Sequence, residues 1–510
     1  MLDSREPLVL NPADNVAILT ARAPEGSRPL GAGAPLSAPV SPGHKLARVA
    51  ILQGGDIVKF GQVIGYATRP IEPGEHVHTH NCGFGAHDQD YHVGADLAAA
   101  RAAIPQIEPA TFQGYRRDNG QVGTRNMIAV CATVNCSATV IRRAAEEVMR
   151  SGVLAYYPTI DGVVAFAHGT GCGMAAEGPG FDNLQRVLWG HATHPNVGAA
   201  VFVGLGCEVM QVARMKSRFG DGAADRFHGL TIQDTGGTTK TIAMIVDQIH
   251  ALLPEVSRAT REAVPASELR LALQCGGSDG FSGITANPAL GAASDLLVGM
   301  GGTAILSETP EIYGAEQLLL RRAATPAVAD KLIERIRWWE RYTEINGGSM
   351  DNNPSPGNKQ GGLTTILEKS LGAAAKGGST PLTAVYEYAE TVTARGFVFM
   401  DTPGYDPVSA TGQIAGGAQV VVFTTGRGSA FGSKPAPTIK VATNDRLYAQ
   451  MPDDMDINCG DIVSAGVSIE AKGREILERV LAVASGEKTK SESLGLGDNE
   501  FVPWQVGAVM

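Results

Sequence analysis

What this chain lacks narrows its possible functions before any motif is considered. It has no apolar run near the ~20 residues that a membrane-spanning helix needs. Its first residues, MLDSREPLVL, lack the basic region and apolar core of a signal peptide. It has no Cys-x-x-Cys pair of the kind that builds a zinc ribbon. We therefore expect a cytoplasmic protein with no membrane partner.

Positive charge is also in short supply. The 510 residues carry 42 Lys and Arg against 52 Asp and Glu, which gives a formal net charge of −10. This balance argues against a nucleic-acid partner. An anionic small molecule is still compatible with it, because one Arg or a helix N-terminus can bind an anion locally. The seven cysteines, an odd number, indicate free thiols or metal ligands in a reducing compartment.

Nucleotide-binding signatures are weak. No Gly-Lys-Ser/Thr ending of a Walker A motif occurs, and Gly204-Leu205-Gly206 has no third glycine at the dinucleotide spacing.

The stretch from Leu269 to Glu316 indicates the fold class. It begins with an apolar strand, LRLAL, which leads into the glycine-rich loop Gln274–Gly280. A helix is expected from about Asn287, and a second strand from Thr303. Strand, loop, helix and strand in this order form a parallel crossover unit. The same pattern recurs from Met127 onward, so we predict doubly wound, Rossmann-like parallel α/β domains.

Changes in periodicity divide the chain into four parts. Residues 1–85 have short strands and turn signals, which predicts a small β-rich domain. Residues 86–115 are expected to be a linker. Residues 116–265 form a first α/β domain and residues 266–510 a second. The polar run at 346–362 is expected to be a long irregular loop, which is usually functional.

Four cysteines share one position in this pattern. Each falls at the predicted end of a strand, in a glycine-rich or capped loop: Cys136, Cys172, Cys207 and Cys275. If the strands belong to facing sheets, the four thiols can converge on a metal. The alternative is that cysteine is simply a small core residue.

A second candidate metal site is the HVHTH sequence. It contains His76, His78 and His80, and strand alternation would place all three on one face. Neutral imidazole is a common ligand of iron, zinc and manganese. The alternative is a solvated polar strand edge.

Five further residues are candidates for binding or proton transfer. Arg125, followed by Asn126, and Arg427 can clamp a carboxylate in bidentate fashion. For each Arg the alternative is a surface salt bridge. Glu208 and His168 are candidate proton-transfer groups. Lys359 can bind an anion, or act as a base if it is desolvated.

Several long motifs resemble one enzyme family. Gly74–Asn81, GEHVHTHN, is similar to the SAF-type domain at the front of sugar-acid dehydratases. The body resembles the altronate and galactarate dehydratases over almost its whole length, in VGTRN at 122–126, HGTGCG at 168–173, QCGGSDGFSGITANPALG at 274–291 and NPSPGNKQGGLTTILEKSLG at 353–372.

The resemblance implies a hydro-lyase that uses Fe2+ or Mn2+. It would dehydrate a sugar acid, with altronate favoured, to a 2-keto-3-deoxy acid by α-proton abstraction and β-hydroxyl elimination. His78 and His80 would bind the metal, and Glu208, His168 or Lys359 would exchange protons. The substrate would be bound by Arg125, Asn126, Ser137, Ser278, Asp279 and Arg427.

Alternatives stay open at this point. Three of the four strand-end cysteines can instead hold a 4Fe–4S cluster whose open iron binds substrate. The substrate can be galactarate or another 2-hydroxy acid, and a non-catalytic sugar-acid binding protein is a further possibility. Sequence cannot give the oligomeric state, for which a homodimer is the commonest case.

Overall fold

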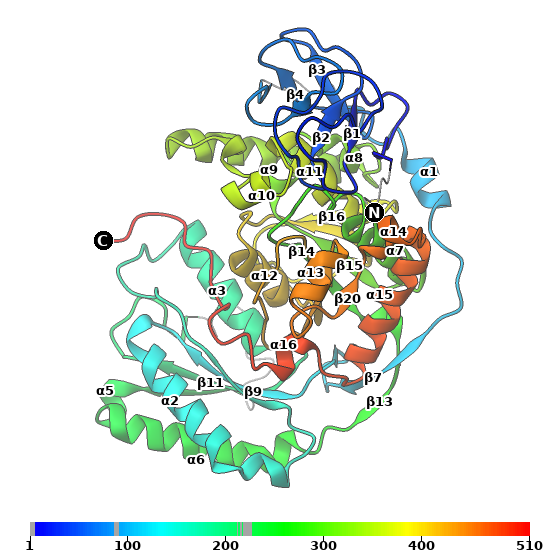
Figure 1. Ribbon diagram of the computed structural model, residues 1–510. Helices are drawn as coiled ribbons and strands as arrows, with labels where there is room; N and C mark the ends of the chain where they lie inside the picture. Colours follow the sequence, from blue (N-terminus) through cyan, green and yellow to red (C-terminus); the bar gives the residue numbers. More distant parts are fainter. Residues whose placement is uncertain (1–5, 86–90, 212, 215–216, 218–226) are drawn as a thin grey trace.

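The computed structural model describes residues 6–85, 91–211, 213–214, 217 and 227–510. Its N-terminal part is a separate small unit beside a larger α/β body (Figure 1). The predicted fold class, a small β-rich N-terminal domain followed by parallel α/β sheets, is confirmed. None of the described helices is long and apolar enough to cross a membrane.

The N-terminal unit consists of two small antiparallel sheets. Its buried side chains, among them Val16, Ile57 and Ile64, form one apolar cluster between the sheets. One sheet has the order β1 (Val16–Ile18), β2 (Lys45–Ala47) and β5 (His76–Val77). The other has the order β3 (Asp56–Lys59), β4 (Gln62–Ala67) and β6 (Cys82–Gly83).

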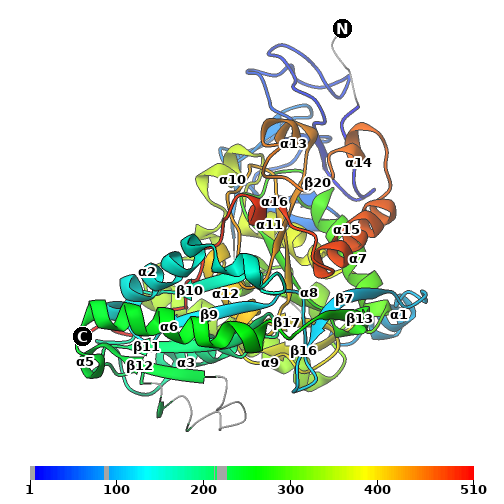
Figure 2. The ribbon, with the colours of Figure 1, turned by 90° about the horizontal axis from the view of Figure 1, so that it is seen from below.

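The predicted linker is partly structured. It contains helix α1 (Leu97–Ala102), close to the expected helical stretch, and strand β7 (Thr111–Arg116). Strand β7 pairs antiparallel with β8 (Val122–Gly123) and with β13 (Arg261–Pro265). Both ribbon views place β7 beside β13 (Figures 1 and 2). The pairing joins residues about 150 positions apart, so no local pattern indicates it. Residues 86–90 of the predicted linker lie outside the described residues.

The first α/β unit has a four-stranded parallel sheet in the order β10-β9-β11-β12. Helices on both faces bury its apolar side chains: α2 (Asn135–Ser151) and α6 (Thr238–Val256) on one, α3 (Pro179–Ala192) on the other. The strands are β9 (Met127–Ala132), β10 (Gly162–Phe166), β11 (Val197–Gly204) and β12 (Phe227–Thr231). The short α5 (Ile232–Thr235) and the 3-10 turn η1 (Val153–Tyr156) complete the unit.

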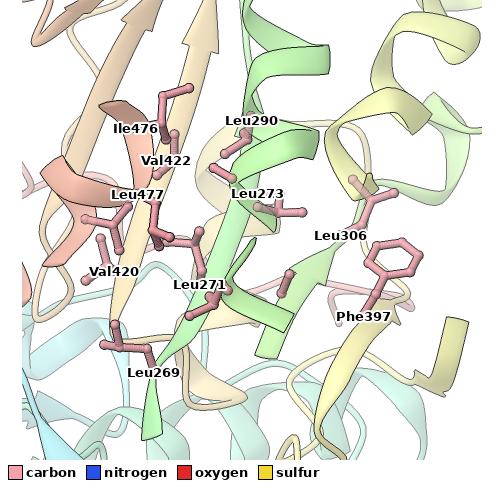
Figure 3. Packing of buried hydrophobic residues seen from close by; sticks show 14 of the residues in the cluster. Leu269, Leu271, Leu273, Leu290, Leu306, Phe397, Val420, Val422, Ile476 and Leu477 are labelled. Carbon is pink, nitrogen blue, oxygen red and sulfur yellow. The ribbon is translucent and has the colours of Figure 1, made fainter. Parts of the chain in front are cut away.

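The second α/β unit has a seven-stranded parallel sheet in the order β16-β17-β15-β14-β18-β19-β20. Leu271 and Leu273 of the central strand pack against Leu290 of α7 (Ala286–Gly299) and Ile476 of α15 (Ile469–Ala484) (Figure 3). Burying each such side chain stabilises the fold by about 1.5–3 kcal/mol. The strands are β14 (Arg270–Cys275), β15 (Thr303–Leu306), β16 (Leu382–Tyr386), β17 (Gly396–Met400), β18 (Val420–Thr425), β19 (Thr438–Ala442) and β20 (Ile457–Asn458).

The remaining helices cover this sheet and form its loops. They are α8 (Gln317–Leu320), α9 (Pro326–Ile345), α10 (Pro356–Gln360), α11 (Ile366–Ala374), α12 (Asp406–Ala415), α13 (Asp445–Gln450), α14 (Asp461–Ser464) and α16 (Lys490–Ser493). The 3-10 turns are η3 (Ala266–Glu268), η4 (Thr309–Glu311), η5 (Met350–Asn352) and η6 (Ala375–Gly377). The polar run at 346–362 is therefore not wholly irregular: it contains η5 and α10, and Ser355 and Asn358 form a capping box for α10.

In both parallel sheets, the first strand along the chain lies in the interior of the sheet. In the first sheet β9 has β10 on one side and β11 on the other. In the second, β14 lies between β15 and β18. The chain leaves the first strand in one direction and later returns to its other side, which opens a crevice at the carboxyl ends of the strands. Each sheet therefore has its own predicted ligand position, at β9/β11 and at β14/β18.

Candidate active site

A cavity of about 570 Å³ lies at the β14/β18 position, between the N-terminal unit and the second α/β unit. Ser41 lines it from the N-terminal unit, and Arg427 lines it from the loop after β18. Gln360 of α10 and Arg446 of α13 also line the cavity. A sugar acid is compatible with a cavity of this size, which is open at the surface and polar.

Three histidines lie together next to this cavity. His44, His76 and His78 each offer a ring nitrogen, and these nitrogens lie within 4.8 Å of one another. His44 Nδ1 is 3.0 Å from His76 Nε2. Strand pairing accounts for the approach, because His44 directly precedes β2 and His76 begins β5, the antiparallel neighbour of β2. His44 Nε2 lies 3.2 Å from the Gln360 carbonyl oxygen, at the cavity wall.

The chemistry of this histidine cluster fits a divalent metal. Burial, followed by the charge of His44, lowers the pKa of His76 to about 3. Burial, followed by Lys45, lowers the pKa of His78 to about 4. The rings are therefore neutral near pH 7, as metal ligands must be. His78 Nδ1 is buried and has no hydrogen-bond partner among the described residues, and buried polar atoms rarely stay unpaired without a ligand.

The cluster differs from the predicted pair. His78 belongs to it, but His80 is exposed, and its ring centroid lies 5.6 Å from that of His76. Strand alternation ends at Val77, because residues 78–81 form a turn in which Asn81 N donates to the His78 carbonyl oxygen. His44, the third member of the cluster, was not among the residues predicted from the sequence. Its only signal was the Gly-His-Lys sequence at 43–45, since a ligand 32 residues away leaves no spacing pattern.

Of the three predicted proton-transfer groups, only Lys359 lies in the loop at this cavity. It is half-buried in α10, directly before Gln360. Arg427 Nη2 donates to Gln360 Oε1 at 2.6 Å, so the predicted carboxylate clamp is beside the same helix. Gln360 and Arg427 thus line one cavity, and the histidine cluster lies behind Gln360, which His44 contacts.

The loop after β14, which carries Ser278 and Asp279, forms part of the cavity wall. The Ser278 carbonyl oxygen accepts a hydrogen bond from Asn358 Nδ2 at 2.9 Å. The Asp279 carboxylate accepts hydrogen bonds from Thr443 Oγ1 and Asn444 Nδ2 at 3.0 and 3.1 Å. Burial raises the pKa of Asp279. These contacts hold the loop after β14 against β19, and Asp279 also lines the cavity.

A buried ion triad joins the N-terminal unit to the body behind the histidines. Glu368 of α11 accepts hydrogen bonds from Lys45 Nζ at 2.7 Å and Lys59 Nζ at 2.9 Å. All three side chains are at most 2 % exposed. Burial alone would raise the pKa of Glu368, but the charges of the two lysines lower it far below its ordinary value. Removing one partner of such a group is costly, so the triad fixes the cavity wall.

The four strand-end cysteines do not converge. Cys275 is buried at the carboxyl edge of the second sheet, whereas the other three are exposed at the edge of the first sheet: Cys136, Cys172 and Cys207. Lys376 Nζ donates to Cys275 Sγ at 2.9 Å, and Cys275 Sγ donates to Glu311 Oε2 at 3.5 Å. Burial raises the pKa of Cys275 to about 12, so this thiol stays neutral.

The edge around Cys275 carries charges that sequence reasoning missed. Lys376 Nζ is 3.3 Å from Glu308 Oε2, and Lys369 Nζ is 2.6 Å from Glu311 Oε1. Burial and the charge of Glu311 raise the pKa of Glu308. Glu308 also adopts a left-handed backbone, with φ 71°, which costs a non-glycine residue about 1–3 kcal/mol.

Arg125, Asn126 and Ser137 lie away from the cavity and have structural partners. Arg125 is buried at the amino end of β9, where Nε and Nη2 donate to Glu492 at 2.7 and 2.8 Å. Asn126 Nδ2 donates to the backbone at 3.0 Å. Ser137 Oγ donates to the Val203 carbonyl oxygen at 2.7 Å. Amino ends of parallel strands face away from the ligand edge, so the carboxylate clamp expected at Arg125 is instead an internal ion pair.

His168 and Glu208 are also engaged inside the first α/β unit. His168 Nε2 is 2.8 Å from the Ala132 carbonyl oxygen, and burial lowers the pKa of this histidine to about 4. Glu208 Oε1 accepts from Thr133 Oγ1 and Oε2 accepts from the Gly206 N–H, both at 2.7 Å. Both side chains are buried beneath the loops that carry the three exposed cysteines.

Comparison with known proteins gives the same organisation over the whole chain. Residues 5–84 match the altronate/galactarate dehydratase SAF domain, residues 114–257 the second domain of D-galactarate dehydratase/altronate hydrolase, and residues 266–509 the C-terminal domain of D-galactarate/altronate dehydratase. The chain belongs to the galactarate/altronate dehydratase family. The predicted resemblance and the predicted hydro-lyase class are confirmed.

Three relatives illustrate the range of this family. The altronate dehydratase of Bacillus subtilis is 37% identical over 88% of each chain. The galactarate dehydratase (L-threo-forming) of Escherichia coli is 37% identical over 89% of this chain and 88% of its own. The (2R)-sulfolactate sulfo-lyase subunit beta of Chromohalobacter salexigens is 32% identical over 78% of this chain and 98% of its own.

Proposed function

We propose that the chain dehydrates altronate to a 2-keto-3-deoxy sugar acid in the cavity between the N-terminal unit and the second α/β unit. The observation that carries this proposal is that Gln360 of α10 joins a cluster of three neutral histidines to the cavity: it contacts His44 through its carbonyl oxygen, and it lines the cavity together with Arg427. Two relatives named altronate dehydratase, at 37% and 35% identity over most of both chains, support the substrate class.

The reaction removes the proton α to the carboxylate and the β hydroxyl, which leave together as water. The enol that remains becomes the 2-keto acid. Fe2+ or Mn2+, held by His44, His76 and His78, would supply stabilisation of the negative charge that develops on the substrate carboxylate. Arg427 would orient that carboxylate by a charge-assisted hydrogen bond. Lys359 is the proposed proton-transfer group, because it lies in the helix that contacts both His44 and Arg427 through Gln360.

Galactarate is the second candidate substrate, and one residue favours it. Galactarate carries a carboxylate at both ends, and Arg446 provides a second cation on the wall of the same cavity. A relative named galactarate dehydratase is as similar to this chain as the altronate enzyme of Bacillus subtilis.

An anaerobic assay of the Fe2+-loaded chain on altronate, galactarate and shorter 2-hydroxy acids tests the proposed reaction. We expect 2-keto acid with altronate as the preferred substrate. Arg446→Gln should lower kcat/KM for galactarate by more than it lowers kcat/KM for altronate. Preference for a shorter hydroxy acid would contradict the proposed substrate, and binding without turnover would contradict catalysis.

The metal ligands are tested by a matched pair of histidine variants. His78→Ala should lower both bound iron and kcat/KM by on the order of 100-fold, because removing even a supporting group of a metal ligand has effects approaching that size. His80→Ala, two residues away and exposed, should change neither. Equal losses in the two variants would move the metal off the His44–His76–His78 cluster.

A further inference from the structure

The crevice of the first α/β unit contains three free thiols. In the sheet order β10-β9-β11, the loop after each strand carries one cysteine: Cys172 after β10, Cys136 after β9 and Cys207 after β11. All three are exposed, whereas the other cysteines are buried. The β9/β11 boundary is the position at which an open α/β sheet binds its ligand, and the reaction proposed above does not use it.

Backbone hydrogen bonds hold the three cysteine loops side by side. Asn135 N, next to Cys136, donates to the Thr170 carbonyl oxygen at 2.8 Å. The Gly171 carbonyl oxygen, next to Cys172, accepts from the N–H groups of residues 209 and 210, just after Cys207, at 3.1 and 3.2 Å. Neighbouring strands lie about 4.8 Å apart. Each thiol is therefore on a loop that is bonded to the loop of another thiol.

A single metal ion and a polynuclear cluster need different spacings of their thiolate ligands. A single tetrahedral ion with bonds of about 2.3 Å holds its sulfur ligands roughly 3.8 Å apart. The three sulfur atoms, all on described residues, do not form a group within 4.8 Å of one another. A polynuclear cluster places its iron atoms between the thiolates and so suits a wider triangle.

Buried polar side chains support these loops from below. Glu208 bonds both the end of β9, through Thr133, and the Gly206 N–H in the loop of Cys207. His168 receives the Thr170 N–H at Nδ1 and bonds the Ala132 carbonyl oxygen through Nε2. A buried carboxylate and a buried imidazole are expensive to place in a core, and here both fix the loops of exposed cysteines.

Glycines bring the backbone close to the thiols. Gly171 and Gly173, which flank Cys172, have φ of 100° and 64°, and Gly206 before Cys207 has φ of 124°. A Cβ at Gly171 would lie 2.2 Å from the Thr133 carbonyl oxygen, so only glycine fits this approach. Gln233 Nε2 donates to Cys207 Sγ at 3.8 Å, and hydrogen bonds to sulfur tune the potential of iron–sulfur clusters.

The position of Cys136 favours the negatively charged thiolate. This residue is in the first turn of α2, a 17-residue helix whose N-cap, Val134, gives no side-chain hydrogen bond. The helix dipole at this end stabilises negative charge. A thiolate and an anionic cluster both benefit from that field.

We propose that Cys136, Cys172 and Cys207 hold a 4Fe–4S cluster through three thiolates, with the fourth iron open toward solvent. Assembly of the cluster releases the three thiol protons and uses two Fe2+, two Fe3+ and four sulfide ions, all supplied from outside the chain, so no further oxidant is needed. The open iron would accept oxygen ligands such as a hydroxyl and a carboxylate of a small hydroxy acid. This metal centre is distinct from the His44–His76–His78 cluster and does not depend on it.

The test begins with full-length chain whose thiols are reduced, reconstituted anaerobically with equal amounts of Fe2+ and Fe3+ and with sulfide, and then desalted. We expect about four irons and four acid-labile sulfides per chain, a visible thiolate-to-iron absorption, and an electron paramagnetic resonance signal after one-electron reduction. The variants Cys136→Ser, Cys172→Ser and Cys207→Ser should each lower bound sulfide several-fold while circular dichroism stays unchanged. Cys275→Ser, at the other sheet edge, should keep the full amount.

Three outcomes would overturn the proposal. These are iron without sulfide, a single zinc bound by the same thiols, and sulfide binding that survives all three Ser variants. His78→Ala serves as the control that separates the two metal centres, because it should retain the sulfide content in full. Loss of altronate turnover with sulfide retained would affect only the proposed function.

Discussion

The carboxyl edges of the two parallel sheets both carry cysteine, but they differ in which side chains are buried. Both have a cysteine at the carboxyl end of their first strand: Cys275 ends β14, and Cys136 lies in the first turn of α2, which follows β9. At the second sheet the thiol of Cys275 is sealed beneath Lys376 and Glu311. At the first sheet the thiols point outward and the charged group, Glu208, is sealed beneath them. The two edges therefore differ in whether solvent reaches the thiol or the charged side chain.

The largest expected effect concerns the sealed charges of the second edge. Lys376→Met should lower the free energy of unfolding by about 3–5 kcal/mol, because it leaves Glu308 buried and unpaired. Denaturant titration measures the loss. The control is Lys331→Met, which removes the exposed pair with Glu390 and should cost about 1 kcal/mol or less. Similar losses in both variants would show that the second edge is not held by its ion pairs.

The next effect is a pH dependence of stability at the same edge. Burial, followed by the charge of Glu311, raises the pKa of Asp406 to about 6. A carboxyl whose pKa is higher in the folded state favours folding at low pH, and that contribution is lost as pH rises from about 4 to 6. Asp406→Asn should therefore gain about 2–3 kcal/mol relative to the natural chain between pH 4 and pH 7. If the free energies of unfolding of the two chains change in parallel with pH, the charges of this edge do not raise the pKa of Asp406.

A smaller effect is expected at Glu208, which is buried below the cysteine loops of the first sheet. Glu208→Gln should cost about 1–3 kcal/mol, because the amide replaces a charged acceptor of the Gly206 N–H. It should also speed the reaction of Cys207 with a disulfide reagent several-fold, since the loop loses its anchor. Glu146→Gln, at an exposed helical pair with Arg150, should leave the reaction rate unchanged. An unchanged rate in Glu208→Gln would show that the loop is held by other contacts.

The smallest energetic effect is at the exposed thiols themselves. Cys172→Ser should change the free energy of unfolding by no more than about 0.5 kcal/mol, as for other surface substitutions. In the folded, metal-free chain three thiols should react promptly with Ellman's reagent, and the other four only after denaturation. Prompt reaction of Cys275 as a fourth thiol would show that solvent reaches this side chain, and it would remove the difference between the two edges.

Much of the fold could be predicted from the sequence. The strands that begin at Leu269 and Thr303 and the helix from about Asn287 are confirmed within a few residues, because their apolar spacing is local. Strands β7 and β13 were missed because they depend on a distant partner. The sequence-based division into domains, the cytoplasmic location and the homodimer stay predictions.

The candidate site could be predicted only in part. Arg427, which lines the cavity, and His78, which belongs to the histidine cluster, were both candidates from the sequence. The turn after Val77 places His80 outside that cluster, and no spacing links His44 to His76. Glu208 and His168 were interpreted as proton-transfer groups because they are titratable residues at strand ends. Their partners, Thr133 and the Ala132 carbonyl oxygen, come from a neighbouring strand that only the folded sheet reveals.

The pairing of β7 with β13 has a consequence for how this protein can be taken apart. The two strands enter and leave the first α/β unit in register, with Thr111 opposite Pro265 and Tyr115 opposite Arg261. The roughly 150 residues between them therefore form a module whose entry and exit points already touch, a geometry that tolerates excision and transplantation. An engineer could join those ends with a short linker, or insert the module into another scaffold, without bridging any gap.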